Sequence, residues 1–481
     1  MPTAAHPTSP AAGGLALALL CVAQFIDVLG VTVVIVALPS IQRELGFAGQ
    51  DLQWVVSVYA LVFGGCLLLA GRAADAFGPR RLFMLGLGLF GAASFACGLA
   101  PSPLSLVISR AAQALGAAMV VPAALALLTT IYPQGPGRDR ALAVWTAAAA
   151  GGGAAGFVLG GLITASLGWE WVFLINTPIA LISLALAPRA LPATRSTDTR
   201  RSLDAWGAAS VTAGLLALIY GLTAAENAGL ASPRTLAPLT LGIALIATFL
   251  LLESRVDAPL VPLGIFRRRM LVGANLTALA LTGTTGAAAV LATSHLQQVL
   301  DRSPAATGFV FLPFSLCVVA GSAVAPALIA RLGARRTAVS GLLGVGAAML
   351  LFTRISPGGG IVYLVVGLSL AGASLGGASV AATGVGTAQA RPGEQGVIAG
   401  LLNTATQLGT AIGIVVLTTI AAARTSAVSG DALNGATPAL VEGFQTAYLA
   451  AAGLALAGAS AAAALLAPSR ATTNRRPGHQ P

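Results

Sequence analysis

The sequence predicts an all-α membrane protein in which fourteen helices span the bilayer. Of its 481 residues, 56% are hydrophobic and only 9% are charged, whereas a soluble domain usually carries about 25% charged residues. Apolar runs of about 20 residues recur along the whole chain, separated by short breaks rich in arginine, proline or glycine. In lipid every backbone polar group must be satisfied within its own segment, so these runs are expected to be helices.

The apolar runs can be placed one by one along the chain. The first continues for about 25 residues; the segment 1–12 before it holds no arginine or lysine, so it lacks the basic start of a signal peptide. We therefore interpret the first run as a retained helix. The runs are 13–38, 52–70, 82–100, 104–131, 141–166, 171–187, 206–225, 236–252, 271–293, 304–330, 337–355, 360–388, 398–423 and 443–467.

The arginines predict the orientation of these spans. All 26 basic residues are arginine, and an even number of spans places both termini on one side. With the termini in the cytoplasm, the inner segments hold 20 arginines, the outer ones hold five, and Arg110 lies inside a span. This asymmetry fits the positive-inside rule and predicts a multi-pass protein with both termini in the cytoplasm. The absence of any lysine suggests a GC-rich bacterial source, so the expected location is a bacterial cytoplasmic membrane. Each cluster, such as Arg267–Arg269, is also typical of a lipid-headgroup anchor, and the scattered pattern argues against a nucleic-acid partner.

An internal repeat predicts how the spans are grouped. The segments after the second and tenth runs align at a glycine and two arginines, namely Gly78, Arg80 and Arg81 with Gly333, Arg335 and Arg336. A shift of eight runs indicates two six-helix halves with two extra helices between them, and paired halves are a known transporter plan. The predicted parts are an N-terminal tail 1–12, a first bundle 13–187, a cytoplasmic linker 188–205, two inserted helices 206–252, a second cytoplasmic linker 253–270, a second bundle 271–467 and a cytoplasmic tail 468–481.

Five segments carry motifs that resemble those of one family. They are the loop Gly71 to Arg81, the stretch Arg110-Ala-Ala-Gln113-Ala-Leu-Gly116, the glycine ridge of 152–161, the segment 169–178 and the stretch 400–409. Together they resemble the fourteen-span drug:proton antiporter family (EmrB/QacA-like) of the major facilitator superfamily, over nearly the whole chain. The resemblance implies the major facilitator fold, with two six-helix bundles and two inserted helices.

The loop after the second run is similar to the superfamily pattern Gly-x-Leu-Ala-Asp-Arg-x-Gly-Arg-Arg. In that family the loop acts as a cytoplasmic gate: it pairs with a neighbouring helix end, and this pairing breaks when the two halves rock. The alternative is a plain turn with headgroup anchors. Ala76 and Pro79 depart from the pattern, which has basic residues at these places. The residues that match the gate are Gly71, Asp75, Gly78, Arg80 and Arg81.

The fifth run contains a ridge of glycines at four-residue spacing. It comprises Gly152, Gly156 and Gly160, followed by Gly161. The ridge resembles the antiporter motif that accompanies export in the family. Small residues at this spacing also serve ordinary close helix packing, so both interpretations stay open.

Trp169 and Trp171 stand at the entry to the sixth run, in a segment that resembles the family pattern Trp-Arg-Trp-Ile-Phe-x-Ile-Asn-x-Pro. Tryptophans at a membrane edge also fit an interfacial belt.

Two ionisable residues fall inside spans and are the candidates for proton coupling. Asp27 lies near the middle of the first span, close to the acidic position of the family pattern, and Arg110 lies about 10 Å into the fourth. Burying such groups costs at least about 2.5 kcal/mol each, so an intramembrane charge is a functional hypothesis by default. Protonation of a buried carboxylate depends on its surroundings, since burial disfavours the charge and a nearby arginine favours it. A permanent structural Asp27–Arg110 pair is the alternative.

The predicted substrate cavity is poor in charge. Its candidate lining residues are Gln113, one turn after Arg110, with Asn403 and Gln407 on one face of the thirteenth span; the latter two also suit bridges between helices. The leading prediction is a proton-coupled exporter of lipophilic drugs or antibiotics, and the alternative is a symporter or facilitator for a metabolite. We expect a monomer in the lipid bilayer that uses the proton gradient and no cofactor.

The sequence gives little support for an enzyme. His295 is the one histidine near a span, and no phosphate loop, nucleophile arrangement or metal-ligand spacing occurs, so no catalytic or metal-ligating residue is predicted. The four cysteines all fall inside apolar runs, where they act as small apolar residues.

Overall fold

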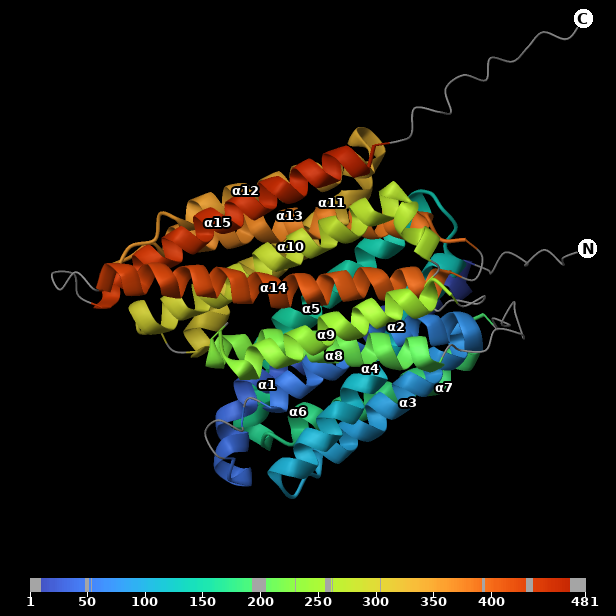
Figure 1. Ribbon diagram of the computed structural model, residues 1–481. Helices are drawn as coiled ribbons and strands as arrows, with labels where there is room; N and C mark the ends of the chain where they lie inside the picture. The colour runs from blue at the N-terminus through green and yellow to red at the C-terminus, as the bar shows by residue number, and fades with distance from the viewer. Residues whose placement is uncertain are drawn as a thin grey trace, which may run out of the picture.

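The computed structural model describes residues 10–47, 52, 54–192, 205–229, 231–255, 261, 263–302, 304–391, 394–429 and 436–467. Most of the predicted tail 1–12, most of the linker 188–205, part of the linker 253–270 and all of the tail 468–481 lie outside these residues. Nearly all of the described chain is helical (Figure 1). The prediction of an all-α protein is confirmed.

The helices follow the predicted order. The N-half consists of α1 (Pro10–Leu45), α2 (Trp54–Phe77), α3 (Pro79–Gly98), α4 (Pro103–Ile131), α5 (Pro136–Leu167), α6 (Trp171–Leu174) and α7 (Asn176–Ala190). The inserted pair is α8 (Ala205–Ala228) and α9 (Pro233–Glu253). The C-half consists of the 3₁₀ turn η2 (Leu263–Arg267), α10 (Arg269–Ser294), the π-helical turn η3 (His295–Val299), α11 (Pro304–Leu332), α12 (Ala334–Phe352), α13 (Ile361–Ala388), α14 (Gln395–Ser429) and α15 (Ala436–Leu465).

Local sequence signals explain several helix ends. Ser102 caps α4 through reciprocal hydrogen bonds with Ser105, and Pro103 follows at a position where its missing N–H is no loss. Gly78 and Gly333 precede α3 and α12 with φ of 91° and 82°, a conformation that favours glycine. The two glycines of the predicted repeat therefore make the same turn in the two halves.

Twelve helical segments of the described chain are long and apolar enough to cross a membrane. In this count α6 and α7 form one segment, Trp171–Ala190, and α10 continues through the π-helical turn to Val299. Two other long helices are not among the twelve, namely α5 with 32 residues and α8 with 24. Within α8 the apolar stretch is Ala209–Leu222, which is shorter than the other candidate spans.

Several helices begin or end together at one end of the bundle. The Tyr132 hydroxyl, just after α4, donates a hydrogen bond to Gly13 O near the start of α1, 2.8 Å away. Gly273 at the start of α10 lies against Leu465 at the end of α15. We call this the arginine-rich end because it carries the arginine clusters around Arg80 and Arg268. The described chain thus starts and stops at the same end (Figure 1).

The two halves meet along two seams, α2 with α14 and α5 with α11. Backbone contacts make the first seam tight at the arginine-rich end. A Cβ added to Gly71 would clash with the carbonyl oxygen of Gly396 and lie 3.2 Å from the Cα of Gly400. Glycine is therefore required where α2 and α14 cross.

The inserted pair covers the α2–α14 seam from outside (Figure 1). Trp54 of α2 stacks on Tyr220 of α8 with ring centroids 6.0 Å apart. Nearer the arginine-rich end, Leu215 of α8 belongs to one buried apolar cluster with Leu68 of α2 and Leu402 of α14. The pair thus packs against both halves.

Candidate functional site

Asp27 lies near the middle of the long helix α1 and is buried. The Tyr59 hydroxyl of α2 donates a hydrogen bond to Asp27 Oδ1 at 2.5 Å. A charged acceptor makes such a bond short and strong. The sequence predicted the carboxylate but not its partner. Tyr59 is the one tyrosine within the first six predicted runs, so a search for polar-tipped aromatic residues in these spans would have found it.

Arg110 of α4 is completely buried and lies over the ring of the same tyrosine. Its Cζ lies 4.4 Å from the centroid of the Tyr59 ring and 5.7 Å from that of Phe173. Its Nε donates to Val55 O at 3.0 Å, near the start of α2. Cation–π contacts of this kind gain strength when the cation is removed from water. The structure thus holds the buried charge in aromatic and polar contacts.

Gln113 extends this network to α3. Arg110 Nη1 donates to Gln113 Oε1 at 2.7 Å, and Gln113 Nε2 donates to Ser94 Oγ at 2.8 Å. Ser94 in turn donates to Phe90 O of its own helix, α3. Both polar ends of the fully buried Gln113 are therefore engaged, and Ser94 is a member that the sequence did not predict.

Tyr59 connects the two ionisable residues. Among the interactions of the described residues, no ion pair joins Asp27 directly to Arg110; each instead contacts Tyr59. Arg110 Nη2 makes no hydrogen bond within the described part of the chain. A permanent Asp27–Arg110 pair is thus not the arrangement found here. Instead α1, α2 and α4 each supply one side chain to a buried Asp–Tyr–Arg unit.

The glycine ridge of α5 packs against α1, the helix that carries Asp27. A Cβ on Gly152 would lie 2.5 Å from Phe25 O, and one on Gly160 would lie 3.0 Å from Val33 O. A Cβ on Gly156 would overlap the Thr32 hydroxyl and lie 2.8 Å from Thr32 Cβ. Gly161 is partly exposed. The ridge therefore sets how closely α5 approaches α1, opposite the turns just before and after Asp27.

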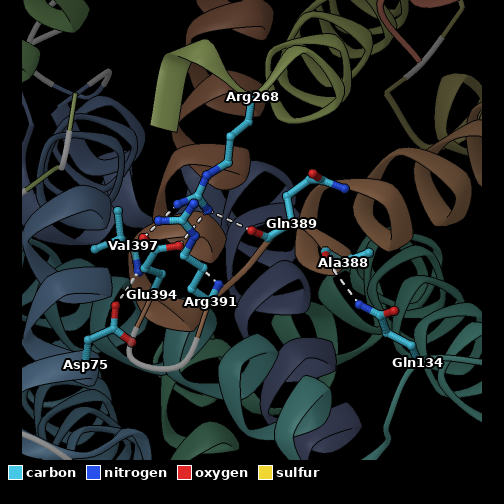
Figure 2. Close-up of polar contacts among 8 residues, drawn as sticks. All are labelled: Asp75, Gln134, Arg268, Ala388, Gln389, Arg391, Glu394 and Val397. Atoms are coloured by element: carbon cyan, nitrogen blue, oxygen red, sulfur yellow. Dashed lines mark hydrogen bonds and ion pairs between the residues drawn. The ribbon is translucent and has the colours of Figure 1, made fainter. Parts of the chain in front are cut away.

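The predicted gate residue Asp75 connects the two halves at the arginine-rich end (Figure 2). Its two carboxylate oxygens accept hydrogen bonds from the backbone N–H groups of Gly396 and Val397, at 2.7 and 2.9 Å. These N–H groups belong to the first turn of α14, where the helix dipole also favours an anion. We call this arrangement the Asp75 latch. Its bonds hold α2 of the N-half to α14 of the C-half.

The other predicted gate residues take different positions. Gly71 allows the close approach to Gly396, and Gly78 makes the turn into α3. Arg80 donates to Pro188 O at 2.9 Å and so ties this turn to the end of α7. Arg81 is exposed.

A second polar group lies beside the latch (Figure 2). Arg268 forms two hydrogen bonds with the Glu394 carboxylate, at 2.6 and 2.9 Å, and its Nη1 also donates to Gln389 O at 2.7 Å. Burial tends to raise the pKa of Glu394, but the hydrogen bonds from Arg268 and from the Arg391 N–H, together with the charges of these two arginines, hold that pKa below its ordinary value. The same bonds raise the pKa of Arg268. The sequence indicated a headgroup anchor here, whereas the side chain of Arg268 is only 17% exposed.

A further hydrogen bond crosses between the halves at this end. Gln134, just before α5, donates from Nε2 to Ala388 O at the end of α13, 3.1 Å away. The halves are therefore joined here both through the Asp75 latch and through this bond to α13.

The predicted cavity residues do not gather at one place. Gln113 lies inside the N-half, whereas Asn403 and Gln407 lie on α14. Asn403 Nδ2 donates to Ala399 O of its own helix at 2.9 Å. Gln407 faces α2, since a Cβ on Gly64 would lie 3.7 Å from its Cβ. A cavity of about 320 Å³ lies elsewhere in the C-half, between α10, α14 and α15, and is lined by Ser294, Gln298, Thr418, Thr425, Phe444 and neighbouring residues.

The two tryptophans of segment 169–178 occupy different surroundings. Trp169 is 3% exposed and its Nε1 donates to Glu44 Oε2 at 3.1 Å, so it is a core residue. Trp171 is 48% exposed, as an interfacial residue would be. The belt interpretation therefore suits only one of them.

Comparison with known proteins identifies the family to which the chain is similar along most of its length. The family model of the Major Facilitator Superfamily matches residues 20–414, with a second match over 274–481. Puromycin resistance protein pur8 of Streptomyces alboniger is 40% identical over 428 residues, which cover 88% of this chain and 84% of that protein. Cephamycin export protein CmcT of Amycolatopsis lactamdurans is 39% identical over 421 residues, 85% of each chain. The tetracenomycin C resistance and export protein of Streptomyces glaucescens is 31% identical over 400 residues, 83% of this chain and 74% of that protein.

A solved structure shows the same arrangement of helices. The human organic anion transporter MFSD10 (TETRAN) matches with a TM-score of 0.66 over 95% of this chain and 100% of that chain, at 17% identity. This similarity concerns the fold alone. Taken with the match of the family model and relatives of up to 40% identity, it establishes the family. The chain belongs to the Major Facilitator Superfamily, and it is a multi-pass membrane transporter rather than an enzyme.

Proposed function

We propose that this protein exports lipophilic antibiotics or drugs from the cytoplasm in exchange for protons, by alternating access. The observation that carries the proposal is the buried Asp–Tyr–Arg unit, in which Asp27 accepts from the Tyr59 hydroxyl and Arg110 lies over the Tyr59 ring. A carboxylate held at this depth, with a movable donor and a cation nearby, can bind and release a proton as its partners shift. The energy source is the proton gradient, without a cofactor.

The substrate class follows from the relatives. Three of them carry names for resistance to, or export of, puromycin, cephamycin and tetracenomycin C. All three compounds are small molecules, which suits a pathway whose candidate lining residues are uncharged. We infer that the cargo of this protein is a compound of that kind.

Helix α2 couples the proton site to the gate. Tyr59 and Asp75 lie on this helix 16 residues apart, about 24 Å at the rise of an α-helix. Tilting α2 away from α14 breaks the two hydrogen bonds of the Asp75 latch and moves Tyr59 relative to Asp27 and Arg110. Arg110 Nη2, which has no partner among the described residues, is then a donor for the ionised carboxylate. Proton release and gate opening thus become parts of one motion.

The protein has fourteen spans in this proposal, as in the drug:proton antiporter branch of the superfamily. They are the twelve candidate spans together with α5 and α8. Helix α5 packs on α1 and α11, and α8 packs on α2 and α9, so both lie among spans rather than outside them. Both termini and the arginine-rich end are cytoplasmic in a bacterial inner membrane, and the functional unit is a monomer.

Transport in vesicles tests the function. Inverted membrane vesicles that contain the protein should accumulate radiolabelled puromycin when a proton gradient is imposed, and an uncoupler should abolish accumulation. Vesicles with Asp27→Asn at equal expression are the control and should show no proton-driven uptake. Accumulation that persists without a proton gradient and requires ATP would exclude the proposal.

Reporter fusions test the topology. A fusion at residue 197 should report a cytoplasmic location, and fusions at Arg302 or Asp431 an external one. A cytoplasmic signal from Arg302 would contradict fourteen spans.

A further inference from the structure

We propose that Arg268 is a positioning residue that keeps the transporter closed at the arginine-rich end by holding Glu394 away from the Asp75 latch. The inference rests on the proposed alternating access but concerns a residue outside the gate motif and outside the buried Asp–Tyr–Arg unit. Arg268 belongs to the linker that joins the inserted pair to α10, so the proposal also gives this linker a role in the transport cycle.

The geometry of α14 shows why Glu394 has to be held. Ile398 N donates to Glu394 O at 3.0 Å, which is the first helical hydrogen bond of α14, so Glu394 occupies the N-cap position. A Ser, Thr, Asp or Asn side chain at the N-cap accepts from the backbone N–H two or three residues later, and Glu394 carries the carboxylate of Asp on a side chain one carbon longer. Those N–H groups belong to Gly396 and Val397, and both already donate to Asp75 of the other half. Asp75 therefore supplies the cap that the helix's own N-cap residue would otherwise make.

Two carboxylates thus compete for one helix end. The Glu394 side chain is turned away from it by two hydrogen bonds from Arg268 and one from Arg391 N, at 3.0 Å (Figure 2). Arg268 is itself fixed by Gln389 O, the carbonyl at the end of α13. The guanidinium also neutralises the second negative charge, which would otherwise repel Asp75 at the same site. Without Arg268, Glu394 is free to cap its own helix and displace Asp75.

The test measures the conformation and requires no substrate. Spin labels are placed on Gly137→Cys and Arg336→Cys in full-length protein whose four native cysteines have been replaced. Both sites are exposed, and a Cβ on Gly137 meets open space. They lie on α5 and α12, on opposite halves of the arginine-rich end. Electron–electron distance measurements in lipid nanodiscs then give the populations in which this end is closed or open. We call the two labels the reporter pair.

Arg268→Ala should raise the ratio of open to closed populations about tenfold, equivalent to about 1.4 kcal/mol. Glu394→Gln alone should leave the ratio near that of the wild type, because the competing charge is gone. The double variant Arg268→Ala/Glu394→Gln should return to the closed population. A salt bridge that merely supported the closed form would be broken by either single substitution, so Glu394→Gln alone would then raise the ratio as well.

Arg269→Ala, an exposed neighbour, is the matched control and should behave like the wild type. If Arg268→Ala does not fold, Arg268→Lys replaces it and should give an intermediate ratio, since lysine lacks the planar fork. The proposal is overturned if the Arg268 variant stays closed, or if the double variant is as open as the single one. Either result would leave the proposed export function unaffected, because puromycin uptake is measured separately.

Discussion

Replacing Gly71 with alanine should open the arginine-rich end of the transporter. In the structure, a Cβ at this position would clash with the carbonyl oxygen of Gly396 and lie 3.0 Å from its carbonyl carbon and 3.2 Å from the Cα of Gly400. Carbon atoms normally approach to about 3.5–4.0 Å, so α2 and α14 would have to separate by roughly 0.5–1 Å. All the obstructing atoms are backbone, so no side chain can rotate away.

The magnitude follows from two opposing effects. Alanine is better than glycine in a helix by roughly 0.5–1 kcal/mol, but this gain is the same in the closed and open states. Overpacking costs about 1–3 kcal/mol and applies only where α2 touches α14, in the closed state. The ratio of open to closed populations should therefore rise by roughly 5- to 150-fold.

The reporter pair measures this ratio directly. Gly453→Ala is the control, because Gly453 is also helical and a Cβ there meets nothing within 4 Å. Purified Gly71→Ala should keep its thermal stability within a few degrees while its distance distribution moves to the open form. A closed distribution for Gly71→Ala, with the control normal, would refute the reasoning that the glycine contact holds the seam.

Four other outcomes are expected. Asp27→Asn should reach the membrane but lose uptake of puromycin driven by a proton gradient, and Arg110→Lys should be at best partly active in the same vesicles because lysine lacks the planar fork. Gly156→Ala should lower the melting temperature by several degrees because its Cβ overlaps the Thr32 hydroxyl, and adding Thr32→Ala should recover part of the loss, as measured by thermal unfolding. The pKa of Glu394 lies below its ordinary 4.5. The stabilisation of the folded protein by the Glu394 carboxylate is therefore complete above about pH 4.5 and disappears as the pH falls through the lower pKa of the folded state. The difference in melting temperature between wild type and Glu394→Gln should accordingly be constant above about pH 5 and vanish in stronger acid.

Much of the fold could be predicted because a bilayer restricts the possible structures. An apolar run of span length has to be helical, so the runs gave the order of the helices, although α1 extends beyond the run 13–38 at both ends. Asp27 and Arg110 were found for the same reason, since a charge inside an apolar run is conspicuous.

The partners of these residues could not be predicted, because they depend on how helices pack. Tyr59 is 32 residues from Asp27 in sequence, and only the crossing of α1 and α2 brings them together. Asp75 was predicted as a gate residue, but Gly396, whose N–H donates to it, is 321 residues away in sequence. Arg268 resembles its two arginine neighbours in sequence, and its partner Glu394 is 126 residues away. Position in an apolar pattern predicts burial, whereas pairing requires the tertiary structure.

The cap that Asp75 of α2 provides to α14 also links the transport cycle to the rate of amide hydrogen exchange. When the latch opens, the amide protons of Gly396 and Val397 lose their acceptor on the other half. Their exchange with deuterium then depends on how often the two halves part, rather than on unfolding of the helix. Deuterium uptake at these two neighbouring amides, measured by mass spectrometry on the native chain, thus reports how often the two halves separate.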